Sequence, residues 1–249
     1  MLSRLDIFVK AGLSNPGSKL SDNAALLNWC SFKEKEYQNS EIFRLVNNIF
    51  SANARGKSEE LSWHSFLDFK VDGHDSFIYL LRRTTCRPRD FVKILKIAKD
   101  LCIQQGITKP TSELLSSDAF RRAYSTYYVD AIKTGLSFYF SEKDIDLLFA
   151  FLRGFKTDFS YGEFVDSFCK SKIGGDLQKT FGDADIVLKL LFDNNMICYW
   201  EQHNIFRWRY RELSIADYNY SLPVEAFEAE SKFKFHKALE KELGVYINN

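Results

Sequence analysis

The chain has 249 residues with 34 basic and 33 acidic side chains, a formal net charge of +1, and 45% hydrophobic and 27% charged residues. This length and composition suit one large or two small globular domains and exclude a disordered chain. The near-zero net charge excludes the overall positive field of a dedicated nucleic-acid-binding protein, but not a local basic patch. With only 12 Gly and 4 Pro beside 23 Phe and 12 Tyr, the composition favours a mainly helical protein.

The first 140 residues combine one short strand with several amphipathic helices. The strand is expected around Leu5–Phe8, followed by a polar segment to Asn23. Apolar spacing predicts helices over 32–50, 76–83, 88–105 and 118–140, with a polar loop over 51–60. The strongest helix begins at Pro88, which suits a first helical turn because its missing N–H has no partner there, and ends before Gly106.

After Phe140 the pattern changes to shorter units. Capping-box-like segments predict helices that begin at Ser141 and Ser160. We expect Gly174-Gly175 to break the chain and a third helix to form over 184–192. Two strands follow, over 196–200 and 205–210, and the tail from Glu225 reads as helix. Three short helices followed by a hairpin are typical of a winged helix. The expected fold is therefore mainly α, with a helical bundle in residues 1–140 and a winged-helix-like domain with a small β-hairpin in residues 141–249.

The cysteines and the ends of the chain indicate a cytoplasmic protein. Five cysteines are scattered without a CxxC pair, and we expect them to be buried thiols in a reducing compartment: Cys30, Cys86, Cys102, Cys169 and Cys198. No secretory leader and no apolar stretch of about 20 residues is visible, so no membrane partner is expected.

No enzyme can be read from the residue chemistry. Gly12–Lys19 (GLSNPGSK) approaches a phosphate-binding loop, but Lys19 is displaced by one position and Leu20 stands where a Ser or Thr should be. The four histidines lack metal-ligand spacing, and no nucleophile elbow is present. We therefore expect no catalytic residue, no metal and no cofactor.

Two groups of arginines are the binding candidates. Arg87 and Arg89 flank Pro88 at a helix start, where guanidinium groups and helix N–H groups could converge on a phosphate or carboxylate. The alternative is that both are surface arginines lying over apolar neighbours.

The second group lies on the last predicted strand. Strict alternation places Phe206, Trp208 and Tyr210 on a core face and the arginines on the other. That second face, Arg207, Arg209 and Arg211, could meet a DNA backbone or an acidic protein surface, or pair with local acids. The preceding helix carries three aspartates and one lysine, which disfavours contact with DNA: Asp183, Asp185, Asp193 and Lys189.

Several segments resemble the C-terminal half of bacterial AAA-like (STAND-type) P-loop ATPases. Arg87–Phe91 (RPRDF) is similar to the R-P-R-D-L/F helix start of that family, and is the most specific of the matches. The other similar segments are Leu2–Phe8 (LSRLDIF), Lys19–Trp29, Phe206–Tyr210 (FRWRY) and His236–Gly244 (HKALEKELG).

The resemblance implies a remnant without the catalytic half. The Walker A and B region of the family lies upstream of the point where this chain begins. What remains would be the last core strand, a helical lid carrying Arg87 and Arg89 in a sensor-like position, and a winged helix. ATP would then enter only if a partner supplied the P-loop, either as the other half of a split ATPase or as the target of a repurposed binding module.

The leading hypothesis is a non-catalytic regulatory module that binds a protein partner, such as an ATPase subunit. Arg4, Arg87 and Arg89 would be presented to a nucleotide or an acidic surface of that partner, and the family suggests a setting in phage defence. The alternative is a winged-helix DNA-binding protein that uses Arg207, Arg209 and Arg211. An enzyme with a site assembled from distant positions is the third hypothesis.

Overall fold

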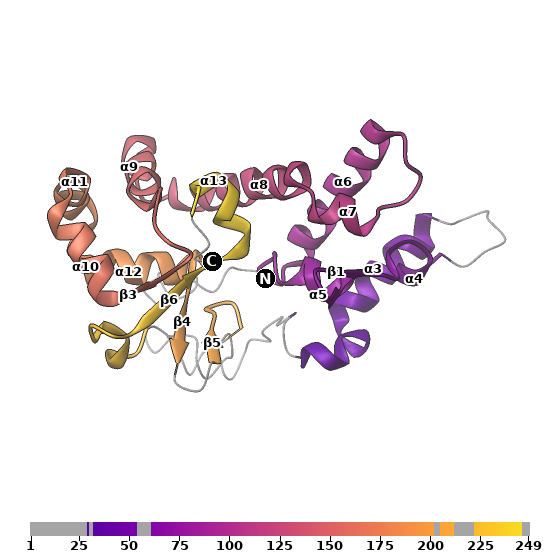
Figure 1. Ribbon diagram of the computed structural model, residues 1–249, viewed down its shortest axis with the longest axis horizontal. Coiled ribbons are helices and arrows are strands. Elements are labelled where there is room, and N and C mark those ends of the chain that lie inside the picture. The colour runs from indigo at the N-terminus through magenta and orange to yellow at the C-terminus, as the bar shows by residue number, and fades with distance from the viewer. Residues whose placement is uncertain (1–28, 30–31, 54–60, 202–204, 212–221, 246–249) are drawn as a thin grey trace, which may run out of the picture.

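The computed structural model describes residues 29, 32–53, 61–201, 205–211 and 222–245. The chain forms two lobes joined along one long helix (Figure 1). The predicted strand around Leu5–Phe8, the P-loop-like segment Gly12–Lys19 and the candidate Arg4 lie outside the described residues. The mainly α fold expected from the composition is confirmed.

The first lobe, here called the helical lobe, is built from short helices and a small hairpin. Its elements are η1 (Glu34–Asn39), α3 (Glu41–Asn53), α4 (Trp63–Leu67), β1 (Lys70–Val71), β2 (His74–Asp75), α5 (Ser76–Leu81), α6 (Pro88–Gln105) and α7 (Ser112–Ser116). The predicted helix over 32–50 is interrupted at Ser40, whose extended backbone separates η1 from α3. Its core centres on the fully buried ring of Phe77, whose centroid lies 4.9–5.1 Å from four other aromatic centroids: Tyr37, Phe43, Trp63 and Phe91.

The sequence signals at the ends of α6 act as predicted. Pro88 occupies the first turn, and Gly106 ends the helix in the left-handed region with a φ of 67°. The Gly106 N–H donates to the carbonyl of Ile103, and the Ile107 N–H to that of Cys102, which satisfies carbonyl groups that would otherwise lack partners.

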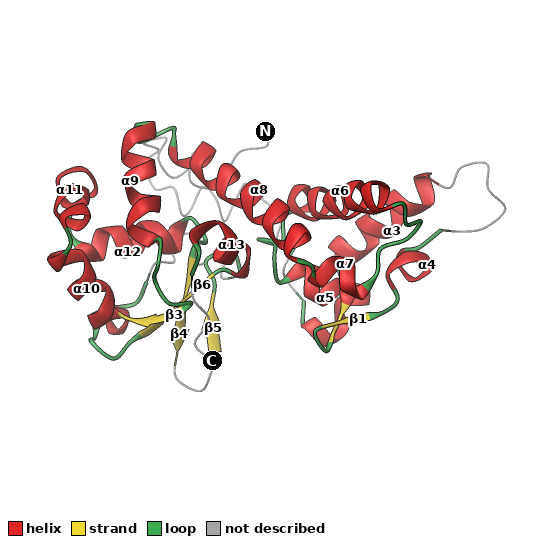
Figure 2. Cartoon of the chain, turned by 45° about the horizontal axis from the view of Figure 1, so that its top comes forward, coloured by secondary structure: helices red, strands yellow, loops and turns green. Residues whose placement is uncertain are grey.

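The second lobe, here called the sheet lobe, places helices around a four-stranded sheet (Figure 2). Its elements are α9 (Glu142–Leu152), β3 (Asp158–Ser160), α10 (Tyr161–Lys170), α11 (Lys172–Phe181), α12 (Ala184–Asp193), β4 (Ile197–Glu201), β5 (Ile205–Arg207), η2 (Val224–Phe227), β6 (Lys232–Phe235), η3 (Lys237–Leu239) and α13 (Glu240–Leu243). The strand order is β3-β6-β4-β5 with every neighbouring pair antiparallel. The predicted helix followed by a hairpin is present as α12, β4 and β5. The capping box at Ser160 is confirmed, since its hydroxyl and the Glu163 carboxylate accept each other's backbone N–H groups.

Two local predictions in the sheet lobe are wrong. Gly174 does not break the chain but lies within α11, where an added Cβ would stand 1.9 Å from the carbonyl oxygen of Phe168. The glycine is thus required by a close backbone approach between α10 and α11. The tail is not helical throughout, because Lys232–Phe235 forms the inner strand β6 with Phe233 and Phe235 fully buried. Lysine and phenylalanine alternate here with the two-residue period of a strand, and this pattern outweighs the helical pattern that follows later in the tail.

The cysteines are also more varied than predicted. Cys102 and Cys198 are buried free thiols as expected, and burial raises the pKa of the Cys198 thiol to about 12. Cys169 is an exposed free thiol, and Cys86 is disulfide-bonded. The prediction of buried thiols is therefore wrong for these two residues, and Cys30 lies outside the described residues.

The long helix α8 (Asp118–Leu136) joins the lobes, and His236 holds them together beside it. The His236 ring stacks on Tyr128 of α8 with centroids 4.7 Å apart and the planes 7° from parallel. Its Nδ1 accepts the N–H of Ala238 at 3.2 Å, so the other ring nitrogen, Nε2, carries the hydrogen and donates to the Thr84 carbonyl of the helical lobe at 3.3 Å. Trp208 packs edge-on against the same ring at 5.0 Å. One neutral imidazole thus contacts both lobes and the helix between them.

We expect acid to destabilise the fold partly through His236. Burial lowers the pKa of His236 to about 3, against the hydrogen bond to Thr84, which raises it. The unfolded chain takes up this proton near pH 6.5 and the folded chain only near pH 3, so stability falls as the pH drops through that window. This residue contributes at most about 1.4 kcal/mol per pH unit.

The measurement is urea unfolding of the wild type and of His236→Gln between pH 7 and pH 4. The variant should be less stable at pH 7 and lose stability with a shallower slope. His64→Gln, on the exposed side of α4, is the control. Parallel slopes for His236→Gln and wild type would contradict the neutral, shared imidazole.

Candidate partner-binding surfaces

Arg87 and Arg89 lie at the start of α6, where a buried aspartate fixes the helix. Asp90 is 4% exposed and accepts hydrogen bonds from Thr85 Oγ1 at 2.7 Å and from Tyr127 Oη of α8 at 3.0 Å. Burial and then the Asp90 charge raise the pKa of Tyr127 to about 12, so its hydroxyl remains a donor at neutral pH. Both arginines are exposed, and the Nε of Arg89 stands 3.8 Å from Asp90 Oδ1. The predicted pair is thus held by a rigid helix start and faces solvent.

Sequence reasoning missed that the same helix face continues as a basic stripe. Arg89, Lys93, Lys96 and Asp100 follow one another at intervals of four, three and four residues, so they line one side of α6. Two exposed apolar side chains share this side, with residue exposures of 43% for Val92 and 67% for Ile103. We call this surface the α6 face; it comprises Arg89, Val92, Lys93, Lys96, Lys99, Asp100 and Ile103, and Arg87 is the N-cap residue that precedes it.

Among the cations of the α6 face, only Arg89 has a carboxylate of the described chain within ion-pair distance, with its Nε 3.8 Å from Asp90 Oδ1. Within the part of the chain that the structure describes, Arg87, Lys96 and Lys99 have no carboxylate within ion-pair distance. Lys93 is half-buried, with its Nζ 5.4 Å from the centroid of the Tyr127 ring. Some cations elsewhere do have such a partner: for example, Lys170 pairs with Asp166 at 2.7 Å. An unpaired row of like charges on one helix favours contact with an acidic surface.

The three strand arginines do not form the predicted exposed row. Strand β5 ends at Arg207, and residues 208–211 form a turn, so the alternation assumed over 205–211 is wrong beyond its first half. The Arg209 side chain is only 15% exposed, with its Nε 3.8 Å from Asp193 Oδ1. Arg211 Nη2 donates to Glu34 Oε1 at 3.1 Å. The chain bends because Trp208 and Tyr210 both turn toward the ring of His236.

Glu34 brings together arginines from two distant segments. Arg82 donates to both of its oxygens, at 3.2 and 2.7 Å, and Arg211 to one of them. Burial alone would raise the pKa of Glu34, but the hydrogen bonds and charges of Arg82 and Arg211 lower it overall. Arg211 therefore has a structural ion pair between the lobes and is not available as a free binding residue.

The aromatic side of the predicted strand is only partly core. Phe206 is 38% exposed and packs on Trp200 with centroids 5.1 Å apart, so its expected core position is wrong. Tyr210 is buried as expected. The short strand β5 leaves Phe206 at the sheet edge, where no further strand of the described chain covers it.

A groove of about 280 Å³ lies between α10, α11 and the start of α12. Its acids have local partners, since Asp183 Oδ1 accepts the Ile186 N–H at 3.0 Å and Asp185 Oδ1 accepts the Tyr161 hydroxyl at 2.6 Å. The hydrogen bond to Asp185, followed by burial, raises the pKa of Tyr161 to about 12. These aspartates cap and brace α12, and they leave the helix with the acidic character noted in the sequence.

Comparison with known proteins bears on the helical lobe. A protein-family model described as the FunZ-associated C-terminal helical domain matches residues 40–134, less than half of the chain. The match runs from the residue before α3 to near the end of α8, and it includes Arg87, Arg89 and the whole α6 face. No curated protein and no solved structure matches the chain. A helical domain in this region is thereby confirmed, and descent from a P-loop ATPase stays a prediction.

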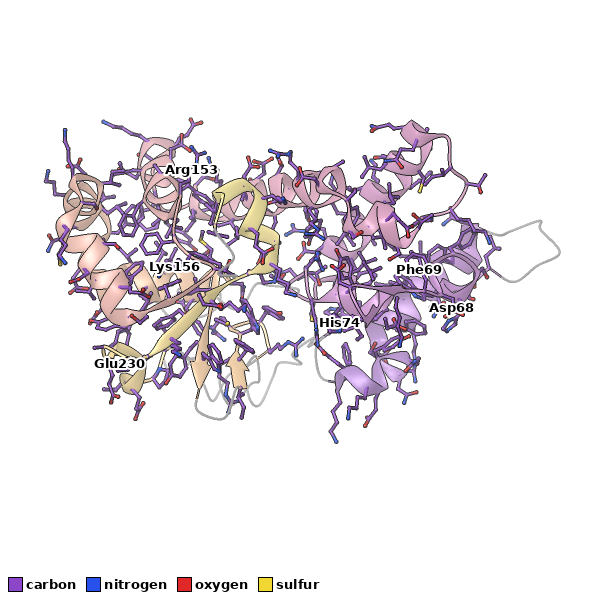
Figure 3. All side chains as sticks on the ribbon, in the orientation of Figure 1. Asp68, Phe69, His74, Arg153, Lys156 and Glu230 are labelled. Carbon is purple, nitrogen blue, oxygen red and sulfur yellow. The ribbon has the colours of Figure 1, made fainter. Side chains whose placement is uncertain are left out.

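In the part of the chain that the structure describes, no helix is both long enough and apolar enough to cross a membrane. Exposed charged side chains instead mark the outer edges of both lobes, as Asp68 and Glu230 do in Figure 3.

We expect loss of the shared Glu34 pairing to destabilise the protein. Arg82→Ala and Arg211→Ala should each lower the free energy of unfolding by about 1 kcal/mol, because each removes a charge-assisted bond that is two-thirds shielded from water. The loss of unfolding free energy in the double variant should differ from the sum of the two single losses, because both arginines share one carboxylate.

Urea unfolding with a double-variant cycle measures this coupling. Arg44→Ala, which removes an exposed pair with Glu41, is the control and should change stability by less than about 0.5 kcal/mol. Strict additivity of the Arg82 and Arg211 changes would argue against the shared pairing.

Proposed function

We propose that this protein is a non-catalytic interaction module whose α6 face binds an acidic surface of a protein partner. The observation that carries the proposal is the row of cations on α6, in which the exposed Lys96 and Lys99 have no carboxylate partner within the described chain, together with the exposed Arg87 and Arg89 at the helix start. An 18-residue helix is about 27 Å long, enough to span a typical recognition surface. Because α6 is anchored through Asp90 to α8, the cations are held on a rigid support.

The composition of the α6 face supports a protein partner over a nucleic acid. Val92 and Ile103 stand exposed among the cations, and such apolar anchors contribute little against a phosphate backbone. Asp100 lies on the same side, where it would repel phosphates but can accept a hydrogen bond from a protein. A mixed surface of this kind is typical of the rim and core of a protein interface.

The alternative DNA-binding function has less support. The order α9, β3, α10 to α12, then the β4–β5 hairpin and β6 is compatible with a winged helix, which we retain as a proposal for the sheet lobe. Asp183 caps α12 and Asp185 lies in its first turn, whereas a helix that contacts the DNA major groove needs positive charge. Of the wing arginines, Arg209 and Arg211 already face acids of the same chain.

The family description agrees with an accessory role. The matching family model is described as a C-terminal helical domain associated with FunZ, and this description supports a domain that works beside another protein part. We propose that the partner surface belongs to such a part, an ATPase subunit being the case suggested by the sequence resemblance. ATP would then be bound by the partner, and a setting in phage defence stays a prediction of the resemblance.

We expect charge reversal on the α6 face to abolish partner binding without unfolding the protein. Arg89→Glu, Lys96→Glu and Lys99→Glu combined should reduce the amount of partner recovered with the tagged full chain at least tenfold, because attraction becomes repulsion. The measurement is quantitative mass spectrometry of nuclease-treated purifications from the native host, with circular dichroism to confirm the fold.

The matched control reverses three exposed lysines of the sheet lobe instead: Lys143, Lys170 and Lys172. If the control variant recovers as little partner as the α6 variant, binding depends on net charge and not on the α6 face, which would contradict the proposal. Recovery that disappears with nuclease alone would assign the α6 face to nucleic acid and overturn the proposal.

A direct DNA measurement separates the two functions. Fluorescence anisotropy with a random duplex should show weak binding that is unchanged by Arg207→Ala, Arg209→Ala and Arg211→Ala together. A steep loss of affinity with salt, which that triple variant flattens, is the result that would favour the winged-helix DNA-binding function instead.

A further inference from the structure

The exposed side chains of α6 have the spacing of a seam between two packed helices. Steps of three, four, three and four residues separate five exposed positions: Arg89, Val92, Lys96, Lys99 and Ile103. Residues separated by alternate steps of three and four lie on one line along a helix, and we call this line the α6 seam. The opposite side of α6 is buried through Phe91, Ile94 and Ala98, so the α6 seam faces away from the core of the helical lobe.

The α6 seam combines two apolar contacts with two lysines between them. Val92 is 43% exposed and Ile103 is 67% exposed, and they are about 16.5 Å apart along the helix axis. Lys96 and Lys99 lie between them and have no carboxylate partner within the described chain. The aliphatic part of a lysine can lie over apolar surface while its ammonium group reaches an acid at the edge of the contact. The α6 seam therefore suits a partner segment with apolar side chains at both ends and acids between them.

The spacing of the α6 seam fits a helical segment better than an extended one. Successive seam positions are about 4.5 or 6 Å apart along the axis, and a second helix presents its own side chains at the same intervals. An extended segment presents side chains on one side only about every 6.7 Å. Over the length of about 21 Å from Arg89 to Ile103, the extended segment would lose about one side chain against the seam. A helix can meet the seam at every level.

The charges of the α6 seam disfavour a second copy of this chain as the partner. Lys96 is the middle position of the seam, so two fully overlapped copies would bring Lys96 against Lys96 whether they ran parallel or antiparallel. Like charges that face each other across a helix pair oppose association. Lys93 adds a further cation beside the seam, against the single acid Asp100 on this face. An acidic helix of a different protein is the complementary partner.

We propose that the α6 seam packs against one acidic amphipathic helix of the partner. The inference rests on the proposed function and specifies the form of the partner segment. Apolar side chains near the two ends of that helix would contact Val92 and Ile103. Asp and Glu side chains between them would pair with Lys96 and Lys99, and these pairs would set the register of the two helices.

Truncation of the apolar ends tests whether the seam packs or only attracts charge. Val92→Ala combined with Ile103→Ala should reduce the partner recovered from the native host about tenfold, because both apolar contacts are lost. Val224→Ala, at an 84% exposed position of the sheet lobe, is the matched control and should leave recovery unchanged. Circular dichroism confirms that each variant folds. Undiminished recovery with the double variant would overturn the packed helix.

Photocrosslinking of the full chain in its native host tests the geometry directly. A photoreactive residue replaces Val92 in one variant and Ile103 in another, and mass spectrometry locates the crosslinked positions of the partner. Both should lie in one segment rich in Asp and Glu and about 11 residues apart, because a helix rises by about 1.5 Å per residue. The same substitution at Val224 is the control and should give no crosslink to that segment.

The remaining outcomes separate this inference from the proposed function. Crosslinked positions only about five residues apart would indicate an extended acidic segment, which would overturn the helix and leave the α6 face as the binding surface. Crosslinks to a second copy of this chain, or to a segment without acids, would also overturn the inference. If neither position crosslinks to protein, the proposed function fails together with it.

Discussion

The arrangement of the whole chain depends on one buried, neutral imidazole. His236 stacks on Tyr128 of the connecting helix, receives the Ala238 N–H and donates to the Thr84 carbonyl across the junction. A protonated ring would lose the Nδ1 acceptor and place an uncompensated charge in the core, so the junction requires the neutral form. Because Thr84 lies within the segment 82–87 that connects α5 to α6, the same contact ties this connection to the sheet lobe.

The arginines near this junction have two different roles. Arg211 and Arg82 are used inside the molecule, where the Glu34 carboxylate holds both and ties the turn after β5 to the helical lobe. Arg87 and Arg89 are exposed at the start of a helix that Asp90 anchors, where both can contact another molecule. The DNA-binding hypothesis relied on the first kind, and the partner-binding proposal relies on the second.

Local sequence signals predicted the elements, but the pairings between distant segments required the structure. Pro88 and Gly106 mark the ends of α6 because each acts on the backbone of a single helical turn. Pro88 has no N–H at the helix start, and Gly106 adopts a positive φ at the helix end. The alternation of lysine and phenylalanine could have predicted the strand β6, but its pairing with β3 and β4 could not be predicted, because both lie far away in sequence. In the same way, Glu34 and Arg211 are 177 positions apart, so no spacing rule could show their pairing. The lysines of the α6 face could have been found, since they follow Arg89 at helical intervals.

The most direct measurement is photocrosslinking of the full chain in its host. A photoreactive residue in place of Lys96 reports on the α6 face, and one in place of Phe206 reports on the edge of the sheet lobe beside the strand arginines. The account predicts crosslinks from position 96 to a segment of a partner protein rich in Asp and Glu, and none from position 206. Crosslinks to DNA from position 206, with none from position 96, would contradict it.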